Sequence, residues 1–337
     1  MKTKWTYSKS GVNIDRADLA KKSIARILGK THSKKVLQKI GHYCAAVDIG
    51  GGRAVAITTD GVGTKVLLAQ KLQKYDTIGV DCVAMNVNDL ICLGVTPLAL
   101  VDYIAIKKPN EKIISDIGRG LAKGAFEAGV SIVGGETAIM PQIIRGENEF
   151  AFDLAGTAIG LVEKKKIIDG SKIKAEDVLI GLRSSGIHSN GMTLARKVLN
   201  ISSRKPNAAS RKLMFELLKP TKIYVKQILK LINSVQVRGL AHITGGGLAN
   251  LLRLNKKIGF KITHWPRLPW IFEQIQRAGK ISDYEMFKTF NMGIGFCVVV
   301  PKKEVSKAMK ILRSEGPVVL GRAIKGRKIL KGALAYK

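Results

Sequence analysis

The chain has 337 residues, of which 46% are hydrophobic and 24% charged, and its mean hydropathy is +0.08. This composition is typical of a soluble protein with two domains of roughly 150 residues each. No apolar run reaches the roughly 20 residues of a membrane-spanning helix, and the first residues lack an apolar core of signal-peptide length. We therefore expect a cytoplasmic protein with no membrane partner.

The net charge of +32 is unevenly distributed, because residues 51–150 carry 10 Lys and Arg against 11 Asp and Glu. Clustered basic residues can bind nucleic acid, but aromatic residues make up only 6% and no helix-turn-helix, zinc-finger or RNP-type signature occurs. We expect no specific nucleic-acid partner, and leave open nonspecific polyanion binding or steering of anionic substrates. The four cysteines form no C-x-x-C pair and are interpreted as reduced core thiols.

Strands and helices alternate along the chain, which predicts an α/β fold with α+β layering. In chain order we expect a helix at 17–28, a strand at 55–59, helices at 65–73 and 77–93, a strand at 98–106, a helix at 113–128, strands at 131–133, 152–161 and 179–182, helices at 191–199 and 220–232, a strand at 240–243, a helix at 248–254, a strand at 296–300 and a helix at 303–315. The charged, turn-prone stretch 162–178 predicts a boundary. The expected organisation is a basic arm (1–40), an N-terminal domain (41–165) and a C-terminal domain (175–337).

The first motif is TTDGVGTK at 58–65, in which a predicted strand ends at Asp60. Gly61 and Gly63 allow a tight turn with accessible N–H groups, and Thr64 and Lys65 add a hydroxyl and a cation. This combination suits a phosphate held partly through a metal on the carboxylate. The alternative is a β-turn closed by an Asx-type bond from the aspartate.

The second motif is MNVNDLICLG at 85–94, where Asn88 and Asp89 lie at the polar edge of an apolar helix. A buried carboxylate needs a partner, and a metal shared with Asp60 would provide one. An internal salt bridge or a cap is the alternative for Asp89. Asp81 is a weaker candidate.

The third motif is VGGETAIMP at 133–141, where a short predicted strand enters Gly134 and Gly135, followed by Glu136 and Thr137. The order of small residues, an acid and Thr repeats that of the first motif. Together with the two aspartates of the earlier motifs, the glutamate supplies hard oxygen ligands suited to Mg²⁺. The three motifs predict a nucleotide–metal site.

The fourth motif, RSSGIHSNG at 183–191, places Ser185, His188, Ser189 and Asn190 at a strand-to-helix junction, where free N–H groups favour anions. His188 lies among polar loop residues and is a candidate general acid or base. A helix N-cap cluster with an exposed histidine is the alternative.

The fifth motif, AHITGGG at 241–247, has three glycines before a helix, which indicates close approach of the backbone at Gly245 and Gly246 to a phosphate. His242 alternates with apolar neighbours, so it is either a strand histidine of the core or a site residue. FNMGIGF at 290–296 is interpreted as a packing loop.

In this order, the motifs closely resemble the aminoimidazole ribonucleotide synthetase family, over nearly the whole chain. The matching strings are YSKSGVNID, DGVGTK, DTIGVDCVAMNVNDL, VGGETAIMP, SSGIHSNG, AHITGGG and FNMGIG. The resemblance implies two α/β domains, with the N-terminal domains pairing into a closed β-barrel across a homodimer. It also implies that ATP activates the formyl oxygen of formylglycinamidine ribonucleotide as a phosphate leaving group, after which a nitrogen closes the imidazole ring.

By the same resemblance, Mg²⁺ would be held by Asp60, Asp89 and Glu136, and the ATP phosphates by Gly61, Gly63, Thr64 and Lys65. The loops around His188 and Gly245 would complete the nucleotide and ribonucleotide pockets. The candidate catalytic residues are Lys65, His188 and His242, and the choice between the histidines as proton carrier stays open. The further candidates for cofactor contact are Asn88, Gly134, Gly135, Thr137, Ser185, Ser189, Asn190, Gly245 and Gly246.

Two positions depart from the family pattern: Ser8 occupies a usual lysine position, with Lys9 after it, and Gln142 replaces a glycine. Thiamine-monophosphate kinase, selenophosphate synthetase, a hydrogenase-maturation enzyme and the upstream amidotransferase-coupled enzyme share the superfamily. SSGIHSNG and FNMGIG favour the cyclo-ligase. A basic nucleic-acid-associated protein on an inactive scaffold is the alternative of a different class, and the intact acidic residues argue against it.

Overall fold

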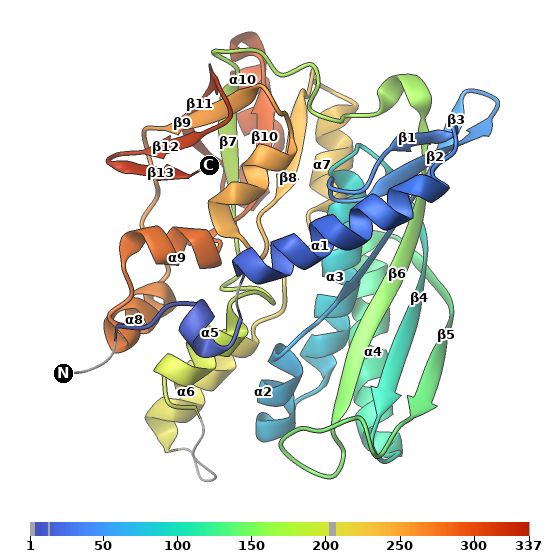
Figure 1. Ribbon diagram of the computed structural model, residues 1–337, viewed down its shortest axis with the longest axis vertical. Coiled ribbons are helices and arrows are strands. Elements are labelled where there is room, and N and C mark those ends of the chain that lie inside the picture. The colour runs from blue at the N-terminus through green and yellow to red at the C-terminus, as the bar shows by residue number, and fades with distance from the viewer. Residues whose placement is uncertain (1–3, 13, 202–206, 337) are drawn as a thin grey trace.

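The computed structural model describes residues 4–12, 14–201 and 207–336. Its strands form two sheets, one in each half of the chain, and helices pack against them (Figure 1). The predicted α/β class is therefore confirmed. In the described part of the chain, no helix is both long and apolar enough to cross a bilayer.

The N-terminal half contains a six-stranded sheet in which β4 and β5 are parallel and the other neighbours antiparallel. In spatial order its strands are β1 (Val36–Gln38), β2 (Ala45–Gly50), β3 (Arg53–Gly61), β6 (Phe152–Glu163), β4 (Thr96–Ile106) and β5 (Ser131–Ile139). The short strand predicted at 131–133 is longer in the structure, because β5 pairs with β4 as far as Ile139. The glycines of the third motif therefore lie within a strand and not in a loop.

Three helices cover one face of this sheet: α2 (Lys65–Leu72), α3 (Asp76–Ile91) and α4 (Glu111–Ala128). Most of α3 is buried, and α4 packs closely against it, since a Cβ at Gly120 would overlap the Asp76 carbonyl group. Asn110 caps the N-terminus of α4, where its side chain accepts a hydrogen bond from the Ile113 N–H. Gly129 caps the C-terminus in the left-handed conformation.

Among the described residues, α2, α3 and α4 leave the opposite face of the sheet uncovered along β6, β4 and β5 (Figure 1). From Leu100 onward the side chains of β4 alternate, so Leu100 and Ile104 are buried beneath the helices while Val101 and Tyr103 point outward. A register shift between Pro97 and Ala99 precedes this stretch, and Leu98 is exposed as well. The exposed fractions of Leu98, Val101 and Tyr103 are 52%, 40% and 42%. A single chain thus leaves an apolar sheet face open to solvent.

The C-terminal half contains a seven-stranded mixed sheet. In spatial order its strands are β13 (Leu334–Tyr336), β12 (Ile329–Lys331), β9 (Ile258–Ile262), β11 (Val318–Lys325), β7 (Val178–Arg183), β10 (Ile294–Val300) and β8 (Gly239–His242). Its α-helices are α5 (Met192–Val198), α6 (Ala208–Leu218), α7 (Val225–Ile232), α8 (Trp270–Gly279), α9 (Asp283–Thr289) and α10 (Val305–Ile311). Residues 164–177 connect the halves and begin with the 3₁₀ turn η3 (Lys164–Lys166).

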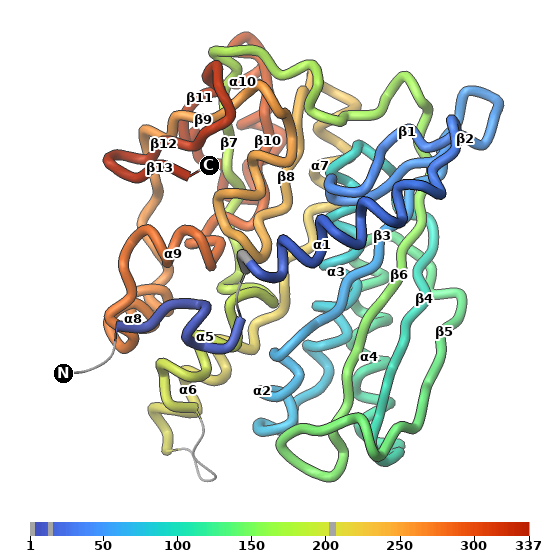
Figure 2. Tube along the Cα trace, in the orientation of Figure 1, coloured from blue at the N-terminus to red at the C-terminus, as the bar shows by residue number. Residues whose placement is uncertain are grey.

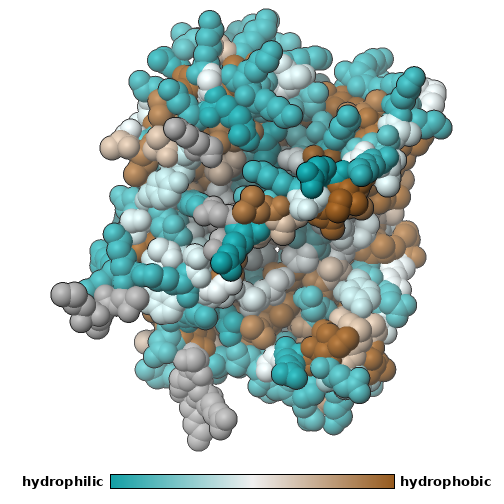
Figure 3. Space-filling view, in the orientation of Figure 1, coloured by the Kyte–Doolittle hydropathy of each residue, from teal (hydrophilic) through white to brown (hydrophobic). Residues whose placement is uncertain are grey.

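The N-terminal segment crosses from one half to the other (Figure 2). It contains the 3₁₀ turn η1 (Ser8–Ser10), helix α1 (Ile14–Leu28) and the turn η2 (Gly29–Thr31), and α1 includes the predicted helix 17–28. The Trp5 N–H donates to the Gly279 carbonyl, and the Tyr7 N–H donates to Glu285 Oε1 at 2.7 Å. Apolar side chains show among polar ones along α1 (Figure 3), where Leu19 is 67% exposed.

Three predicted helices differ in the structure. The helix predicted at 220–232 begins only at Val225, because the N–H groups of Thr221 and Tyr224 are bonded to side chains of the other half. The segment 248–254 is the 3₁₀ helix η4 (Gly247–Arg253). The segment 303–315 is divided into η5 (Lys302–Glu304), α10 and η6 (Arg313–Glu315).

Candidate active site

Three titratable side chains meet where the two halves face each other. Asp60 lies near the end of β3, Asp89 in the last turn of α3, and His242 at the end of β8. His242 Nδ1 lies 2.8 Å from Asp89 Oδ1, so this contact joins the N-terminal helix to the C-terminal sheet. His242 is fully buried, and its Nε2 has no hydrogen-bond partner among the described residues.

Asp60 is partly buried and lies near the second carboxylate. Burial, and then the charge of Asp89, raises the pKa of Asp60 to about 6. The Gly61 N–H donates to Asp60 Oδ1 at 2.8 Å, and Asn86 Nδ2 donates to the Asp60 carbonyl at 3.2 Å. No lysine or arginine forms an ion pair with Asp60 among the described residues, so two carboxylates share a site that favours a cation.

The DGVGTK turn presents an exposed backbone beside Asp60. Strand β3 continues through Gly61, and Gly63 has a φ of 70°, which favours glycine. Gly63 and Thr64 are exposed, and Thr64 Oγ1 lies 2.9 Å from Thr193 Oγ1 of the C-terminal half. The backbone at Gly63 and Thr64 is therefore accessible, and its contact with a phosphate stays a prediction.

Lys65 does not face this turn, although the sequence names it as a phosphate contact and a catalytic candidate. It is fully buried, with its Nζ 2.8 Å from Asp81 Oδ2 and 2.6 Å from the Lys219 carbonyl oxygen. Asp81 also accepts from the Thr221 N–H, the Thr221 hydroxyl and the Ser189 hydroxyl. The lysine charge is thus neutralised inside a network that joins the halves, and burial lowers the pKa of Lys65 although Asp81 opposes this shift.

Two further predicted ligand contacts bond to protein groups. Asn88 donates to the Lys222 carbonyl at 2.8 Å and accepts from the Tyr224 N–H at 3.0 Å. The Ser185 hydroxyl donates to the Pro220 carbonyl at 2.6 Å. Asn88 thus holds residues 222–224 against the N-terminal half, and the Ser189 bond to Asp81 adds a second contact between the halves.

His188 lies close to His242 in this interface, and it is buried with a φ of 60°. Its Nε2 accepts from the Ser185 N–H at 3.4 Å, while Nδ1 has no partner among the described residues. Burial, and then the charges of His242 and Lys65, lowers the pKa of His188 well below its usual range. His188 is consequently neutral near pH 7, and it is not the exposed residue that the alternative interpretation expects.

The triple-glycine loop is held by one side chain. Asn250 Nδ2 donates to the carbonyl groups of Thr244, Gly245 and Gly247. Gly246 has a φ of 98°, and a Cβ at Gly245 would lie 3.0 Å from Asn190 Oδ1. This brings the fourth and fifth motifs together, and Asn190 Nδ2 is a buried donor without a partner among the described residues.

The third motif lies elsewhere. Across the sheet, Asp60 pairs with Gly156, which pairs with Asp102, which pairs with Gly135. Glu136 is one residue further along β5, beside Tyr103, so its side chain points to the outer face while Asp60 points to the inner face. Gly134 and Thr137 belong to the same exposed strand.

The predicted metal site with Asp60, Asp89 and Glu136 is therefore not assembled within one chain. In residues 4–12, 14–201 and 207–336, no three His, Cys, Asp or Glu side chains are grouped to hold a metal. The reason is the pleat of the sheet, because continuing β5 as a strand directs Glu136 away from the helices.

Several site residues escape sequence reasoning. The Arg253 guanidinium lies 5.2 Å from the centre of the Tyr43 ring, and its charge partly opposes the rise in the pKa of Asp60 that burial causes. Asp102 lies on the same sheet face as Asp60, and burial raises its pKa. Asn86 belongs to the second motif and could have been predicted from it. Arg253 and Asp102 belong to no recognisable motif.

The chain has two sheets, and carboxylates, a glycine-rich turn and a glycine loop lie between its halves. These features indicate a class of α/β protein that can bind a phosphorylated ligand. The chain belongs to the AIR synthase related protein family: residues 41–162 match the N-terminal domain of that family and residues 174–331 its C-terminal domain. The resemblance predicted from the motifs is confirmed.

Curated relatives extend this match along the chain. The phosphoribosylformylglycinamidine cyclo-ligase of Pyrococcus horikoshii is 52% identical over 313 residues, which cover 91% of each chain. That of Methanococcus maripaludis strain C6 is 46% identical over 312 residues, covering 91% of this chain and 88% of the relative. Among solved structures, thiamine monophosphate kinase from Aquifex aeolicus has the same fold at 14% identity, with a TM-score of 0.65 over 92% of this chain and 96% of that one.

Proposed function

We propose that this chain catalyses the ATP-dependent cyclisation of formylglycinamidine ribonucleotide to aminoimidazole ribonucleotide, with release of ADP and phosphate, in purine biosynthesis. The observation that carries the proposal is the 52% identity, over 91% of both chains, to a curated phosphoribosylformylglycinamidine cyclo-ligase. The site supports it, because the proposed ATP contacts and the histidines lie where the two halves meet.

The phosphates of ATP bind at the DGVGTK turn, through the exposed backbone of Gly63 and Thr64 and the Thr64 hydroxyl, while the Gly61 N–H is bonded to Asp60. Mg²⁺ fits beside them, because burial and then the charge of Asp89 raise the pKa of Asp60, and a bound cation would offset both effects. Asp60 and Asp89 would hold this ion, which would neutralise phosphate charge during phosphoryl transfer. Lys65 has no direct part, since its Nζ is already bonded to Asp81.

The reaction needs a phosphoryl group on the formyl oxygen and then a carbon–nitrogen bond, with phosphate leaving from that carbon. The protein positions the reacting atoms and protects them from water. His242 orients Asp89 through its Nδ1, while its Nε2 is buried and has no partner among the described residues. His188 is the weaker proton acceptor, because burial opposes its charged form. Asn190 and the Gly245–Gly246 backbone contact the ribonucleotide.

A homodimer is part of this proposal. The outward face of the six-stranded sheet, with Leu98, Val101 and Tyr103 exposed, has the apolar character of a face covered by a second copy. Glu136 lies on this face, so its role belongs to the dimer and not to the metal. The division into domains at 162–178, a cytoplasmic location and the absence of a specific nucleic-acid partner stay predictions.

The test is release of ADP by the purified protein with MgATP, with and without formylglycinamidine ribonucleotide, while aminoimidazole is measured. We expect ADP and imidazole product in equal amounts, and only with the substrate present. Phosphorylation of thiamine monophosphate, with the cyclisation substrate left unchanged, would contradict the proposal while leaving the family assignment intact. Light scattering of the same sample gives the number of copies.

A further inference from the structure

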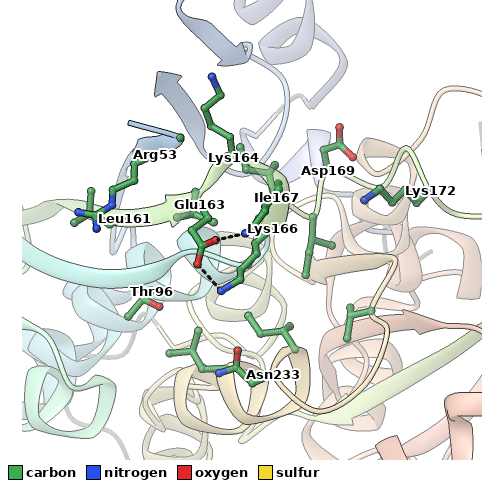
Figure 4. Close-up of a pocket in the computed structure, with 18 of the residues that line it drawn as sticks. Arg53, Thr96, Leu161, Glu163, Lys164, Lys166, Ile167, Asp169, Lys172 and Asn233 are labelled. Carbon is green, nitrogen blue, oxygen red and sulfur yellow. Dashed lines mark hydrogen bonds and ion pairs between the residues drawn. The ribbon is translucent and has the colours of Figure 1, made fainter. Parts of the chain in front are cut away.

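A cavity of about 1200 Å³ lies between the two halves, away from the candidate active site (Figure 4). The N-terminal half contributes the turn between β2 and β3, the start of β4 and the end of β6, and the C-terminal half contributes residues around the end of α7. Arg53 in its wall and Asp60 lie seven residues apart on one strand. At about 3.3 Å per residue, this separates the cavity from Asp60 by roughly 23 Å.

The lining is strongly basic. Its charged members are Arg53, Lys164, Lys165, Lys166, Lys172 and Arg238 against Glu163 and Asp169. Four of the six cations already have partners: Lys164 pairs with Asp48, Lys165 and Lys166 both pair with Glu163, and Arg238 pairs with Asp177.

Arg53 and Lys172 have no ion-pair partner within the described residues. Figure 4 places them on opposite sides of Glu163. Two unneutralised cations in one hollow repel each other and attract a polyvalent anion. Within the described residues, no carboxylate forms an ion pair with either of these two positive charges.

The remaining lining is mainly apolar. It consists of Leu161, Ile167, Ile168, Leu229, Ile232, Val235 and Val237, with Thr96, Asn233 and Gln236 as neutral polar groups. An inorganic anion would leave this apolar wall uncovered. A ligand that combines a phosphate with a flat, largely apolar body satisfies both parts of the lining.

We propose that this cavity is a second binding site, which takes a nucleoside phosphate. The unpaired charges of Arg53 and Lys172, on opposite sides of the cavity (Figure 4), attract the phosphate, and the base lies against the apolar wall near Ile232. The volume suits one nucleotide with water and not a folded polymer. Because the walls come from both halves, an occupied cavity holds the halves together.

The first test maps the site with 8-azidoadenosine monophosphate, without Mg²⁺, by irradiation of the full-length protein and mass spectrometry of its peptides. We expect label within 167–172 or 229–238, and its loss when AMP is added. Label confined to peptides that contain 58–65 or 241–247 would assign all nucleotide binding to the active site and overturn the proposal.

The second test measures AMP affinity by calorimetry under the same conditions. The double variant Arg53→Ser/Lys172→Ser should bind at least tenfold more weakly, whereas Lys112→Ser/Lys123→Ser, which removes two exposed charges on α4, should bind normally. Equal losses in both pairs would show an effect of net charge alone and contradict the proposal.

Inorganic phosphate and oligouridylate serve as competitors in the same AMP-binding experiment. Inorganic phosphate should displace AMP at least tenfold less well than AMP itself, since it leaves the apolar wall uncovered. Equal displacement would identify a bare anion site, and binding of oligouridylate without binding of AMP would identify an RNA surface. Either result overturns a nucleoside phosphate site.

Discussion

His242 Nδ1 and Asp89 Oδ1 lie 2.8 Å apart, and this contact links the last turn of α3 to the end of β8. The histidine ring is buried and stacks near Phe296, with 6.3 Å between ring centroids. A fixed ring holds the carboxylate in one orientation, as an outer hydrogen bond does for a metal ligand. The two halves of the chain thus prepare the site together.

Replacing His242 tests this relationship. We expect His242→Gln to lower kcat at least tenfold and to raise the Mg²⁺ concentration needed for half-maximal activity, because Asp89 loses its orienting partner. Steady-state kinetics at several Mg²⁺ concentrations measures both effects. His264→Gln, at an exposed position, is the matched control. An unchanged Mg²⁺ requirement would exclude the orienting role.

Asp60→Asn should separate stability from activity. The pKa of Asp60 is raised from 3.8 to about 6 in the folded state, so the folded state binds the extra proton between these values and its stability falls as the pH rises through this window. Removing the charge should therefore increase the free energy of unfolding at pH 7.5, without metal, by up to about 3 kcal/mol. Cyclisation should be lost.

Urea unfolding at pH 4 and pH 7.5 measures this effect. The difference between variant and parent should be small at pH 4 and larger at pH 7.5. A variant that is less stable than the parent at pH 7.5 would show that Asp60 stabilises the fold through contacts other than its charge.

The Lys65–Asp81 pair should act as a structural unit. Leaving one buried charge alone costs about 3–5 kcal/mol, so Lys65→Met and Asp81→Leu should each destabilise by this order. The double variant should lose less than the sum of the two, with a coupling of about 2 kcal/mol. Lys74→Met, which removes a partly exposed partner of Asp76, should cost below about 1 kcal/mol.

Chemical denaturation of the four variants gives these values. Activity supplies a separate readout, since Lys65→Met should retain cyclisation at a temperature where it is folded. A lower kcat in a fully folded Lys65→Met protein would contradict this structural role and support the direct phosphate contact that the sequence motif predicts.

His42 should make the protein sensitive to acid. Burial lowers the pKa of His42 from 6.5 to about 4, and both ring nitrogens lack partners among the described residues. The unfolded state therefore binds more protons between these values, and stability falls as the pH drops from 6.5 towards 4. This contribution amounts to about 2–3 kcal/mol.

His42→Phe should remove this acid sensitivity. Lowering the pH from 7 to 4.5 should reduce the melting temperature of the parent more than that of the variant, as measured by differential scanning calorimetry. A constant difference across this range would show that the histidine does not titrate differently in the folded and unfolded states.

Gly247 tests the glycine loop. Its φ is 52°, and a Cβ there would overlap the Phe287 carbonyl oxygen. Gly247→Ala should destabilise by about 2–4 kcal/mol and lower substrate affinity, because the loop must shift. Gly134→Ala is the matched control, with no positive φ and open space around the added Cβ, and should change stability by under about 0.5 kcal/mol. Urea unfolding and substrate KM report the two effects.

The sequence by itself determined the family through its ordered motifs. It also determined the α/β class and the central elements, because apolar residues that recur at regular spacing, as along α3, are a local signal. It also marked the DGVGTK turn, Asp89 and the glycine loop, whose residue types carry their chemistry at short spacing. Strands β9, β12 and β13 are short and lie towards one edge of their sheet, so they have no comparable local period.

Only the tertiary structure decided which motif residues share a site. Lys65 follows the turn directly, yet its side chain enters a network completed by Thr221, 140 residues after Asp81. Glu136 repeats the pattern of the first motif, but strand pairing with β4 directs it to the opposite face from Asp60. The physical reason is the same in both cases: side-chain direction depends on pairing and packing between distant segments, which no local spacing contains.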